Sequence, residues 1–500
     1  MNAFVDARSV PAGTTIETDL AIIGGGAAGI TLALALADAP IKVLLLESGG
    51  SGFDAKTQAL YSGSVTGAQY LSLKDSRLRY FGGSTNHWGG WCRPLEPSDF
   101  EARSWVPHSG WPISYSDIAE YFPHAQALVE AGPPIYDKDK PFTDACGAPL
   151  NLGTGGVYTS WFQFSKTRGA ILPTHFGERY GADLKRIPRL TVIEHANVTN
   201  LALAPNAASI DHLDVATLSG RKFTVKPKYT VLATGGIENA RIMLASNGVM
   251  AKGVGNGNDM VGRFFADNPI PRTVATMVLF DGNMAPYYQN NQSTTDGVYF
   301  RATLAPTENF KRERAVMSSL TTVEDVVQLD ELGQAAVTTT ASALGVDAGS
   351  AKAFSLGCGM EMAPDPDRRF TLTDERDALG MPRVKLHMTF PDADFARYRE
   401  TLKELGRQLM ATRTGMIRID RASRESWFSV MDYGDHHLGT TRMSADPRSG
   451  VVDANQQVHG IPNLYVAGSS VFTTYSASNP TMNLVALTLR LANHLKGIFK

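Results

Sequence analysis

The sequence has very little cysteine. Cys92, Cys146 and Cys358 are the only three in 500 residues, and they lie far apart. Disulfide frameworks and cysteine-based zinc sites need several cysteines at short spacings, so the sequence predicts neither and we expect no metal. Scarce cysteine also fits a reducing compartment. Because no basic segment precedes an apolar stretch at the start, we expect no signal peptide and a cytoplasmic location. Export with a signal-bearing partner is the alternative.

An excess of charge of either sign is also missing. The chain has 47 lysines and arginines against 49 aspartates and glutamates, which gives a net charge of −2. Nucleic-acid-binding domains typically carry a basic face, so we expect no nucleic-acid partner. The hydrophobic fraction of 43% is ordinary for a globular protein. At 500 residues the chain is long enough for two or three domains.

Long uninterrupted hydrophobic runs are nearly absent. Residues 20–37 form an uncharged run close to the length of a membrane span. Three glycines, Gly24, Gly25 and Gly26, stand early in it and would interrupt a spanning helix. The run divides better into a strand, a turn and a helix, so we expect no membrane span.

These three glycines belong to a dinucleotide-binding pattern. Gly24-x-Gly26-x-x-Gly29 lies between an expected strand and an expected helix, and a second apolar strand ends at Glu47. In such a unit, glycines allow a tight turn and close approach to a pyrophosphate, and an acidic residue about 20 positions on binds ribose hydroxyls. The helix N-terminus attracts the phosphates. The pattern by itself fits FAD and NAD equally.

A second glycine-rich segment is the unusual stretch YFGGSTNHWGGWCRP, residues 80–94. It holds four glycines around His87, a density that regular helices and strands do not tolerate. We interpret it as backbone packed against a wide, flat ring. Residues 233–246 and the C-terminal segment around 464–481 are two further glycine-containing segments of this kind.

Together these segments resemble the glucose–methanol–choline (GMC) family of FAD-dependent oxidoreductases, over residues 19–497. Within it, the chain is most similar to the sugar-oxidising members, such as pyranose oxidases and glycoside 3-oxidases or 3-dehydrogenases. The resemblance implies an FAD site formed by Gly24, Gly26, Gly29, Glu47, Gly83, Ser84, Asn86, His87, Trp88, Gly89, Val198, Ala233, Gly468, Ser469, Pro480 and Thr481. Two roles are open to His87: a covalent bond to the flavin, as the spacing from Gly82-Gly83 implies by resemblance, or a non-covalent contact.

The same resemblance implies a catalytic pair. In DHHLGTTRM, His436-x-x-Gly439-Thr440 matches the family's catalytic base, whereas the neighbouring His437 is expected to be structural. Asn479 stands where the family keeps the partner of the base. Its alternative role is to cap the helix that begins at Pro480. In the implied mechanism, His436 takes the hydroxyl proton of the substrate while the substrate carbon gives a hydride to flavin N5.

The order of expected elements predicts an α/β fold. A Rossmann-type FAD-binding domain is expected from three separate segments, residues 15–130, 190–267 and 431–500, because the last strand and helix repeat the first unit. Residues 131–189 are expected to be a linker or lid. Residues 268–430 are expected to form a substrate-binding domain with a largely antiparallel sheet.

The predicted activity is oxidation of a sugar, glycoside or cyclitol hydroxyl to the carbonyl. Oxygen or an external acceptor would reoxidise the flavin, and a small electron-transfer or export subunit is a candidate partner. The alternatives are a non-sugar alcohol, a non-redox FAD-containing lyase or binding subunit, and an NAD-dependent dehydrogenase. An NAD-dependent dehydrogenase would leave the His87 segment unexplained. Trp161, Phe162 and Phe164 are either a sugar-stacking lid or part of the core.

Overall fold

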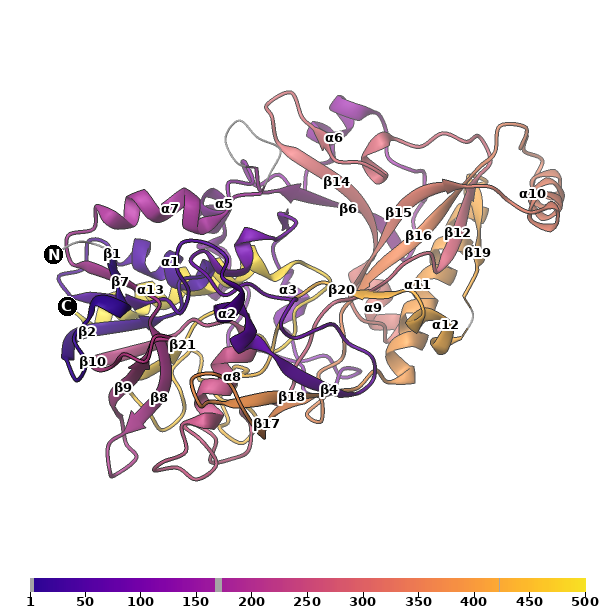
Figure 1. Cartoon of the computed structure of the whole chain (residues 1–500). Coiled ribbons are helices and arrows are strands. Elements are labelled where there is room, and N and C mark those ends of the chain that lie inside the picture. Colours follow the sequence, from indigo (N-terminus) through magenta and orange to yellow (C-terminus); the bar gives the residue numbers. More distant parts are fainter. Residues whose placement is uncertain (1–3, 167–172, 422) are drawn as a thin grey trace.

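The computed structural model describes residues 4–166, 173–421 and 423–500 (Figure 1). Its first sheet has eight strands, in the order β1 (Phe4–Asp6), β7 (Leu190–Glu194), β3 (Val43–Leu46), β2 (Thr15–Ile23), β10 (Lys222–Leu232), β9 (Ile210–Ala216) and β8 (Asn197–Leu203), with β21 (Leu464–Val466) also paired to β10. The pairs from β1 to β10 and from β10 to β21 are parallel, whereas β8 and β9 form an antiparallel extension.

Strand β3 and the last four residues of β2 are continuous apolar runs because helices cover this part of the sheet. Every residue of β3 and the last four of β2 are buried, as expected for strands of a covered parallel sheet. Helix α1 (Ala27–Ala35) packs beside α7 (Phe176–Lys185) and α13 (Pro480–Ile498), and α8 (Gly236–Ala245) packs against β8. The predicted Rossmann-type α/β fold is confirmed, and β21 and α13 are the elements that return to it from the C-terminal end.

The second large sheet is antiparallel throughout, which confirms the second part of the fold prediction. Its order is β19 (Gly415–Ile419), β12 (Ala275–Leu279), β16 (Lys352–Met360), β15 (Ser319–Val327), β14 (Tyr299–Pro306), β6 (Val157–Phe164) and β5 (Trp91–Cys92), with β13 (Gln292–Ser293) paired to β14. Helix α11 (Asp392–Ala411) packs against β19 and β6, and α10 (Glu331–Leu344) lies at the far end in Figure 1.

Two small sheets join parts of the chain that are distant in sequence. Strands β17 (Arg369–Arg376) and β18 (Pro382–Met388) form a hairpin that pairs with β4 (Gly63–Gly67), and β11 (Pro269–Pro271) pairs with β20 (Met431–Tyr433). The hairpin falls within residues 268–430, for which a single largely antiparallel sheet was expected. It lies in a separate sheet instead, because β4 supplies its backbone partner.

The remaining short elements connect these layers. They are η1 (Ala7–Ser9), α2 (Ala55–Gln58), η2 (Ala59–Tyr61), η3 (Gly83–Asn86), α3 (Pro97–Phe100), α4 (Ser116–Ala119), α5 (Phe122–Leu128), α6 (Asp139–Cys146), η4 (Pro286–Tyr288), α9 (Glu308–Arg314), α12 (Arg424–Phe428) and η5 (Ser469–Val471). The domain boundaries stay a prediction. Sheet membership crosses them, since β5 and β6 both belong to the antiparallel sheet and α7 belongs to the first layer.

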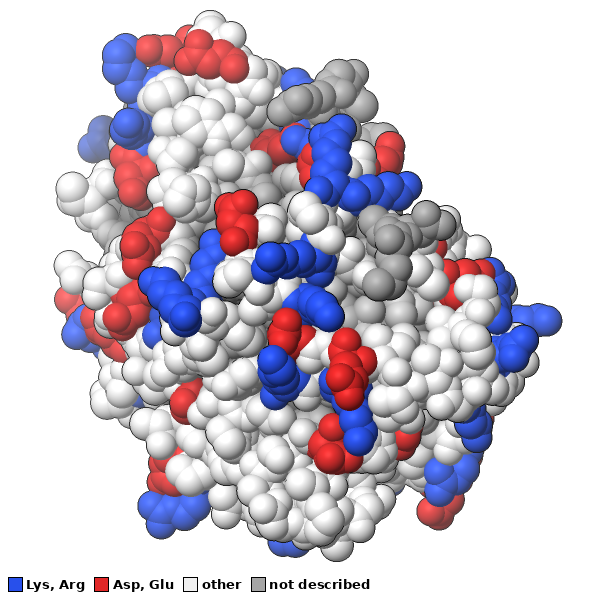
Figure 2. All heavy atoms as spheres, turned by 90° about the vertical axis from the view of Figure 1, so that its left-hand side faces the viewer, with Lys and Arg blue, Asp and Glu red and all other residues white. Residues whose placement is uncertain are grey.

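The hydrophobic core extends through both large sheets as one cluster. Trp161, Phe162 and Phe164 are at most 5% exposed. They are therefore core residues of β6, and the lid interpretation is wrong. None of the described helices combines the length and apolarity needed to cross a membrane. Figure 2 shows basic and acidic side chains intermixed over the face formed by the Rossmann end of the molecule.

Candidate active site

The turn between β2 and α1 is built where only glycine fits. Gly24 has a φ of +109°, and a Cβ there would lie 2.5 Å from the carbonyl oxygen of Ala233. A Cβ on Gly29, in the first turns of α1, would lie 1.9 Å from the carbonyl oxygen of Gly24. Gly26 is the N-cap of α1. The first and third glycines of the motif are therefore required by packing, whereas a Cβ on Gly26 would come no closer than 3.9 Å to Gly83.

Glu47 is held rigidly beside this turn. It follows the last residue of β3 and is 5% exposed. Its Oε2 accepts a hydrogen bond of 2.8 Å from the amide of Gly25, and its Oε1 accepts one of 2.7 Å from the amide of Gly49. The carboxylate is thus fixed at the end of β3, the position expected for a ribose-binding residue.

The segment of residues 80–94 packs directly on the glycine turn. The amide of Gly82 donates to the carbonyl oxygen of Gly25 at 2.8 Å, and a Cβ on Gly83 would lie 3.1 Å from the Cα of Gly26. The glycines of the two segments therefore allow their backbones to touch. We interpret this backbone contact as the reason for the unusual glycine density around His87.

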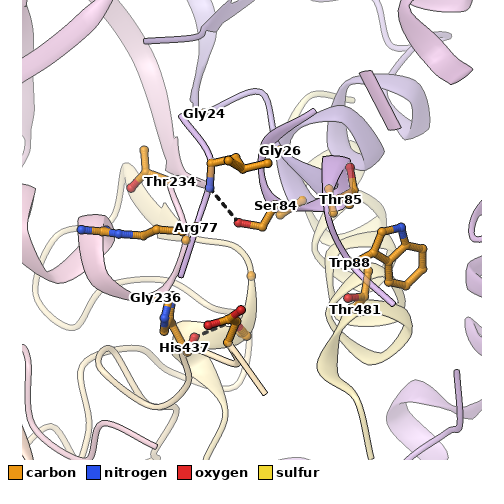
Figure 3. A pocket seen from close by; sticks show the side chains of 18 of the residues that line it. Gly24, Gly26, Arg77, Ser84, Thr85, Trp88, Thr234, Gly236, His437 and Thr481 are labelled. Carbon is orange, nitrogen blue, oxygen red and sulfur yellow. Dashed lines mark hydrogen bonds between the residues drawn. The ribbon is translucent and has the colours of Figure 1, made fainter. Parts of the chain in front are cut away.

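Both segments line one cavity of about 500 Å³. Of the predicted site residues, those that line it are Gly24, Gly26, Glu47, Gly83, Ser84, His87, Trp88, Gly89, Val198, Ala233, Gly468, Ser469, His436, Asn479, Pro480 and Thr481. Gly29 and Asn86 do not. Gly29 packs α1 against the turn, and the Asn86 side chain donates to the carbonyl oxygen of Phe81 at 3.0 Å. Figure 3 shows Gly24, Gly26, Ser84, Trp88 and Thr481 around the cavity, with Arg77, Thr234 and His437.

A buried charged cluster in the cavity wall was missed by the sequence analysis. Glu238 of α8 accepts from Arg77 at 3.0 Å and from Arg79 at 3.1 Å, and Arg241 lies 3.3 Å away with its other nitrogen on Asp377. Burial opposes ionisation of Glu238, but the three arginines outweigh it and lower its pKa to about 2. The cluster carries one net positive charge. Two arginines just before the glycine-rich segment were the available signal, but nothing in the sequence pairs them with α8.

His436 is held at the other end of the cavity by three hydrogen bonds. Its backbone amide donates to Oδ1 of Asp267 at 2.9 Å. Its Nδ1 lies 2.7 Å from Oδ1 of Asn268, and its Nε2 lies 3.2 Å from Nδ2 of Asn479. Burial lowers the pKa of His436 to about 3, so the ring is neutral at physiological pH. A neutral imidazole can accept a proton.

Asn479 and His437 have different surroundings. Asn479 is the N-cap residue of α13, but its side chain makes no capping hydrogen bond and reaches His436 instead. His437 is 8% exposed, its Nε2 lies 3.2 Å from Ser76 Oγ, and its carbonyl oxygen accepts from Ser469. The Asn479 side chain therefore does not cap α13, which was its predicted alternative role.

Polar residues outside the predicted set line the cavity near His436. They are Arg272, Asp432, Tyr433 and Asp435. Burial raises the pKa of Asp435 to about 6, and its backbone has a φ of +57°. Non-glycine residues seldom adopt this conformation away from functional sites and turns. These groups can bind the hydroxyls of a polar substrate.

The residues of the cavity fit FAD. The glycines leave bare backbone in the wall at the start of α1, where unpaired amides attract phosphate, and the net charge of the arginine cluster suits an anion. Glu47 is fixed by two backbone amides at the end of β3, and a neutral histidine and an amide lie at the opposite end of the cavity. A nucleotide cradle joined to a neutral histidine and an amide indicates the class: an FAD-dependent oxidoreductase.

Comparison with known families agrees. Residues 19–78 match the FAD binding domain, and residues 364–488 match the GMC oxidoreductase family. The chain is therefore similar to GMC oxidoreductases over its C-terminal part and to FAD-binding domains over its N-terminal part. The FAD match excludes the NAD-dependent alternative, which the glycine pattern alone had left open. Among the residues that the structure describes, no cluster suited to a metal ion is found.

Two curated relatives align along nearly the whole chain. The fructose dehydrogenase large subunit of Gluconobacter japonicus is 23% identical, covering 97% of this chain and 99% of that protein. The 2-methyl-1,2-propanediol dehydrogenase of Mycolicibacterium austroafricanum is 24% identical, covering 97% and 96%. Among solved structures, the pyridoxine 4-oxidase of Mesorbium loti has the same fold, with a TM-score of 0.60 at 17% identity over 95% of this chain and 98% of that one.

Proposed function

We propose that this enzyme oxidises a hydroxyl group of a sugar, glycoside or cyclitol to a carbonyl, with His436 as the base. The observation that carries the proposal is Nε2 of His436, a ring nitrogen in the cavity wall that faces the amide of Asn479. The similarity to a fructose dehydrogenase large subunit and the polar residues Arg272 and Asp435 support a polyhydroxylated substrate.

In this proposal His436 and Asn479 have different roles. His436 accepts the hydroxyl proton at Nε2, and Asn479 donates a hydrogen bond to the substrate oxygen and stabilises its developing negative charge. FAD, when bound, supplies the acceptor for the hydride that leaves the substrate carbon. Because burial disfavours an imidazolium here, we expect proton uptake by His436 to be coupled to the loss of hydride.

The role of His87 is a separate proposal. Its side chain lines the cavity, and burial lowers its pKa, so the ring is largely neutral and nucleophilic. We propose it as the covalent anchor of the flavin. Acid precipitation of the protein tests this: yellow colour retained in the pellet supports the bond, and flavin lost entirely to the supernatant leaves only a contact.

The test of the main proposal is anaerobic mixing of the yellow holoenzyme with glucose, methyl glycosides, inositol, polyols and simple alcohols, one at a time. We expect a sugar or cyclitol to bleach the flavin absorbance. Admission of air then distinguishes oxygen from another acceptor. If dithionite bleaches the flavin but no alcohol does, a non-redox role replaces the proposal.

A second candidate substrate is a small non-sugar alcohol. The full-length similarity to a 2-methyl-1,2-propanediol dehydrogenase favours it. Bleaching by a simple diol but not by sugars would select it. A small electron-transfer or export subunit is a further proposal, supported by the relative that is itself named a large subunit. Co-purification of the chain from its native host tests that proposal.

A further inference from the structure

We propose that Asn268 is a positioning residue that fixes the tautomer of His436, so that the proton sits on Nδ1 and the basic nitrogen faces the cavity. The inference rests on the proposed role of His436 as the base. Asn268 does not line the cavity and makes no contact there. It acts through the imidazole ring and, by its bond to Ser476, through the loop that carries Asn479.

The orientation of the Asn268 amide is determined by its surroundings. Its Nδ2 donates to the carbonyl oxygen of Met360 at 2.9 Å and to that of Ser476 at 3.3 Å. Rotating the amide by half a turn would set Oδ1 against these two carbonyl oxygens, which cannot donate. Oδ1 therefore faces His436, and Asn268 is 3% exposed, so water does not compete.

This orientation settles the place of the ring proton. An amide oxygen only accepts hydrogen bonds, so His436 Nδ1, 2.7 Å from Asn268 Oδ1, carries the hydrogen. A neutral imidazole has one such hydrogen, which leaves a lone pair on Nε2. The amide nitrogen of Asn479 lies 3.2 Å from Nε2 and donates to that lone pair. With the Asn479 amide oriented as it stands, this tautomer satisfies both contacts.

An amide serves here where a carboxylate would not. The neighbouring Asp267 is fully buried and already accepts from the hydroxyl of Tyr70 at 2.5 Å and from the amides of Asn268 and His436. Burial raises the pKa of Asp267 to about 8. An ionised carboxylate at position 268 would stabilise an imidazolium, which can no longer accept a proton. The neutral amide holds the Nδ1 proton without adding charge.

The same amide links three distant segments. Asn268 precedes β11, Met360 ends β16, and Ser476 lies three residues before Asn479 with a φ of +59°. The bond to Ser476 holds the loop that carries Asn479 in register with the base. One side chain therefore orients His436 and ties it to the antiparallel sheet and to the Asn479 loop.

Nitrogen NMR of the holoenzyme labelled with ¹⁵N-histidine tests the inference without any substrate. The His436→Gln variant assigns the His436 signals by their loss. We expect the wild type to show a protonated Nδ1 and an unprotonated Nε2. Asn268→Leu, which removes the acceptor, should give a mixture of tautomers. Asn268→Ala, which also removes the acceptor but with a smaller side chain, should give a mixture of tautomers as well.

Rapid mixing with whichever alcohol bleaches the flavin adds a second measurement. Asn268→Leu should slow flavin reduction about 100-fold, within the range that a misplaced base proton costs. KM should change little, because Asn268 does not touch substrate. Asn290→Leu, at an exposed position outside the cavity, is the matched control and should reduce normally.

Two results would overturn the inference: a wild-type ring protonated on Nε2, or an unchanged tautomer in Asn268→Leu. If Asn268→Leu does not fold, Asn268→Ala decides by the tautomer of the ring, and an unchanged tautomer there would overturn the inference. If no alcohol reduces the flavin but the Nδ1 tautomer depends on Asn268, the proposed function fails and the positioning role stands.

Discussion

The two ends of the cavity differ in what forms the wall, backbone at one end and side chains at the other. Around Gly24, Gly26 and Gly83 the wall is mostly backbone, and the second glycine-rich segment lies directly on the first. Around His436 and Asn479 the wall is made of side chains that orient one another through hydrogen bonds. A backbone wall is determined by the positions of glycines along the chain. A side-chain wall is determined by which residues from distant segments come into contact when the chain folds.

The two ends also treat charge differently. The nucleotide end carries buried ions, since Glu238 holds Arg77 and Arg79 in the wall. At the other end the side chains that contact the His436 ring are the amides of Asn268 and Asn479, and burial keeps the pKa of His436 low. A permanent charge suits the binding of a charged cofactor, whereas a neutral base is needed before it can take a proton.

The largest effect is expected at the backbone end. Gly29→Ala would place a methyl group 1.9 Å from a backbone carbonyl oxygen. We expect a loss of about 4 kcal/mol or more in the free energy of unfolding, because backbone cannot move aside as a flexible side chain can. The thermal midpoint and the flavin absorbance of the purified protein measure it.

Gly26→Ala is the matched control for this prediction. The nearest atom to its added methyl lies 3.9 Å away, in Gly83. The variant should fold with a normal thermal midpoint but bind less flavin, because the methyl group lies in the cavity wall. Equal behaviour of the two alanine variants would contradict the division of roles between these glycines.

The next effect is expected at the catalytic end. His436→Gln should slow flavin reduction by about 10²–10⁴-fold, the usual contribution of a general base, while the protein stays yellow. His437→Gln changes a neighbour whose Nε2 contacts Ser76, and it should slow reduction far less. Stopped-flow absorbance under anaerobic conditions compares them. A His436 variant that reduces at the wild-type rate would refute the assignment of the base.

A smaller effect is expected from Asn479→Asp. The change keeps the shape but replaces a donor by a negative charge beside the developing negative charge on the substrate oxygen. We expect reduction to slow by about 10²–10³-fold, as when an oxyanion donor is removed. Asn479→Ser, which keeps a donor, should retain more activity. Identical rates in all three proteins would place Asn479 outside the site.

The smallest expected effect is on stability as the pH changes. The pKa of His436 is about 3 in the folded protein and about 6.5 in an unfolded chain. Below pH 6.5 the His436 ring is protonated in the unfolded chain but stays neutral in the folded protein. The contribution of His436 to stability is therefore complete above pH 6.5 and is lost as the pH falls towards 3.

Urea unfolding measures this linkage. Between pH 6.5 and 5.5 the wild type should lose roughly 1 kcal/mol more than His436→Gln, which lacks the titrating group. Other buried groups, such as Asp267, contribute equally to both proteins and cancel in the difference. Parallel losses in the two proteins would mean that the ring protonates without cost in the folded state.

Much of the fold could be predicted because its signals are local. The apolar strands β2 and β3, the helix α1 after a glycine turn, and the long helix α13 each follow from their own residues. The placement of the β17–β18 hairpin could not be predicted, because its pairing with β4 joins residues about 320 positions apart. The burial of Trp161 likewise depends on the sheet around β6.

The sequence by itself determined the glycine turn at the nucleotide end of the cavity and singled out His436 and Asn479, the proposed base and its amide partner. Glycine spacing and short motifs carry that information, because a turn is shaped by neighbouring residues. Only the tertiary structure decided the arginine cluster around Glu238 and the contact of Asn268 with His436. Those contacts join side chains from separate elements, and their strength comes from burial, which exists only once the chain has folded.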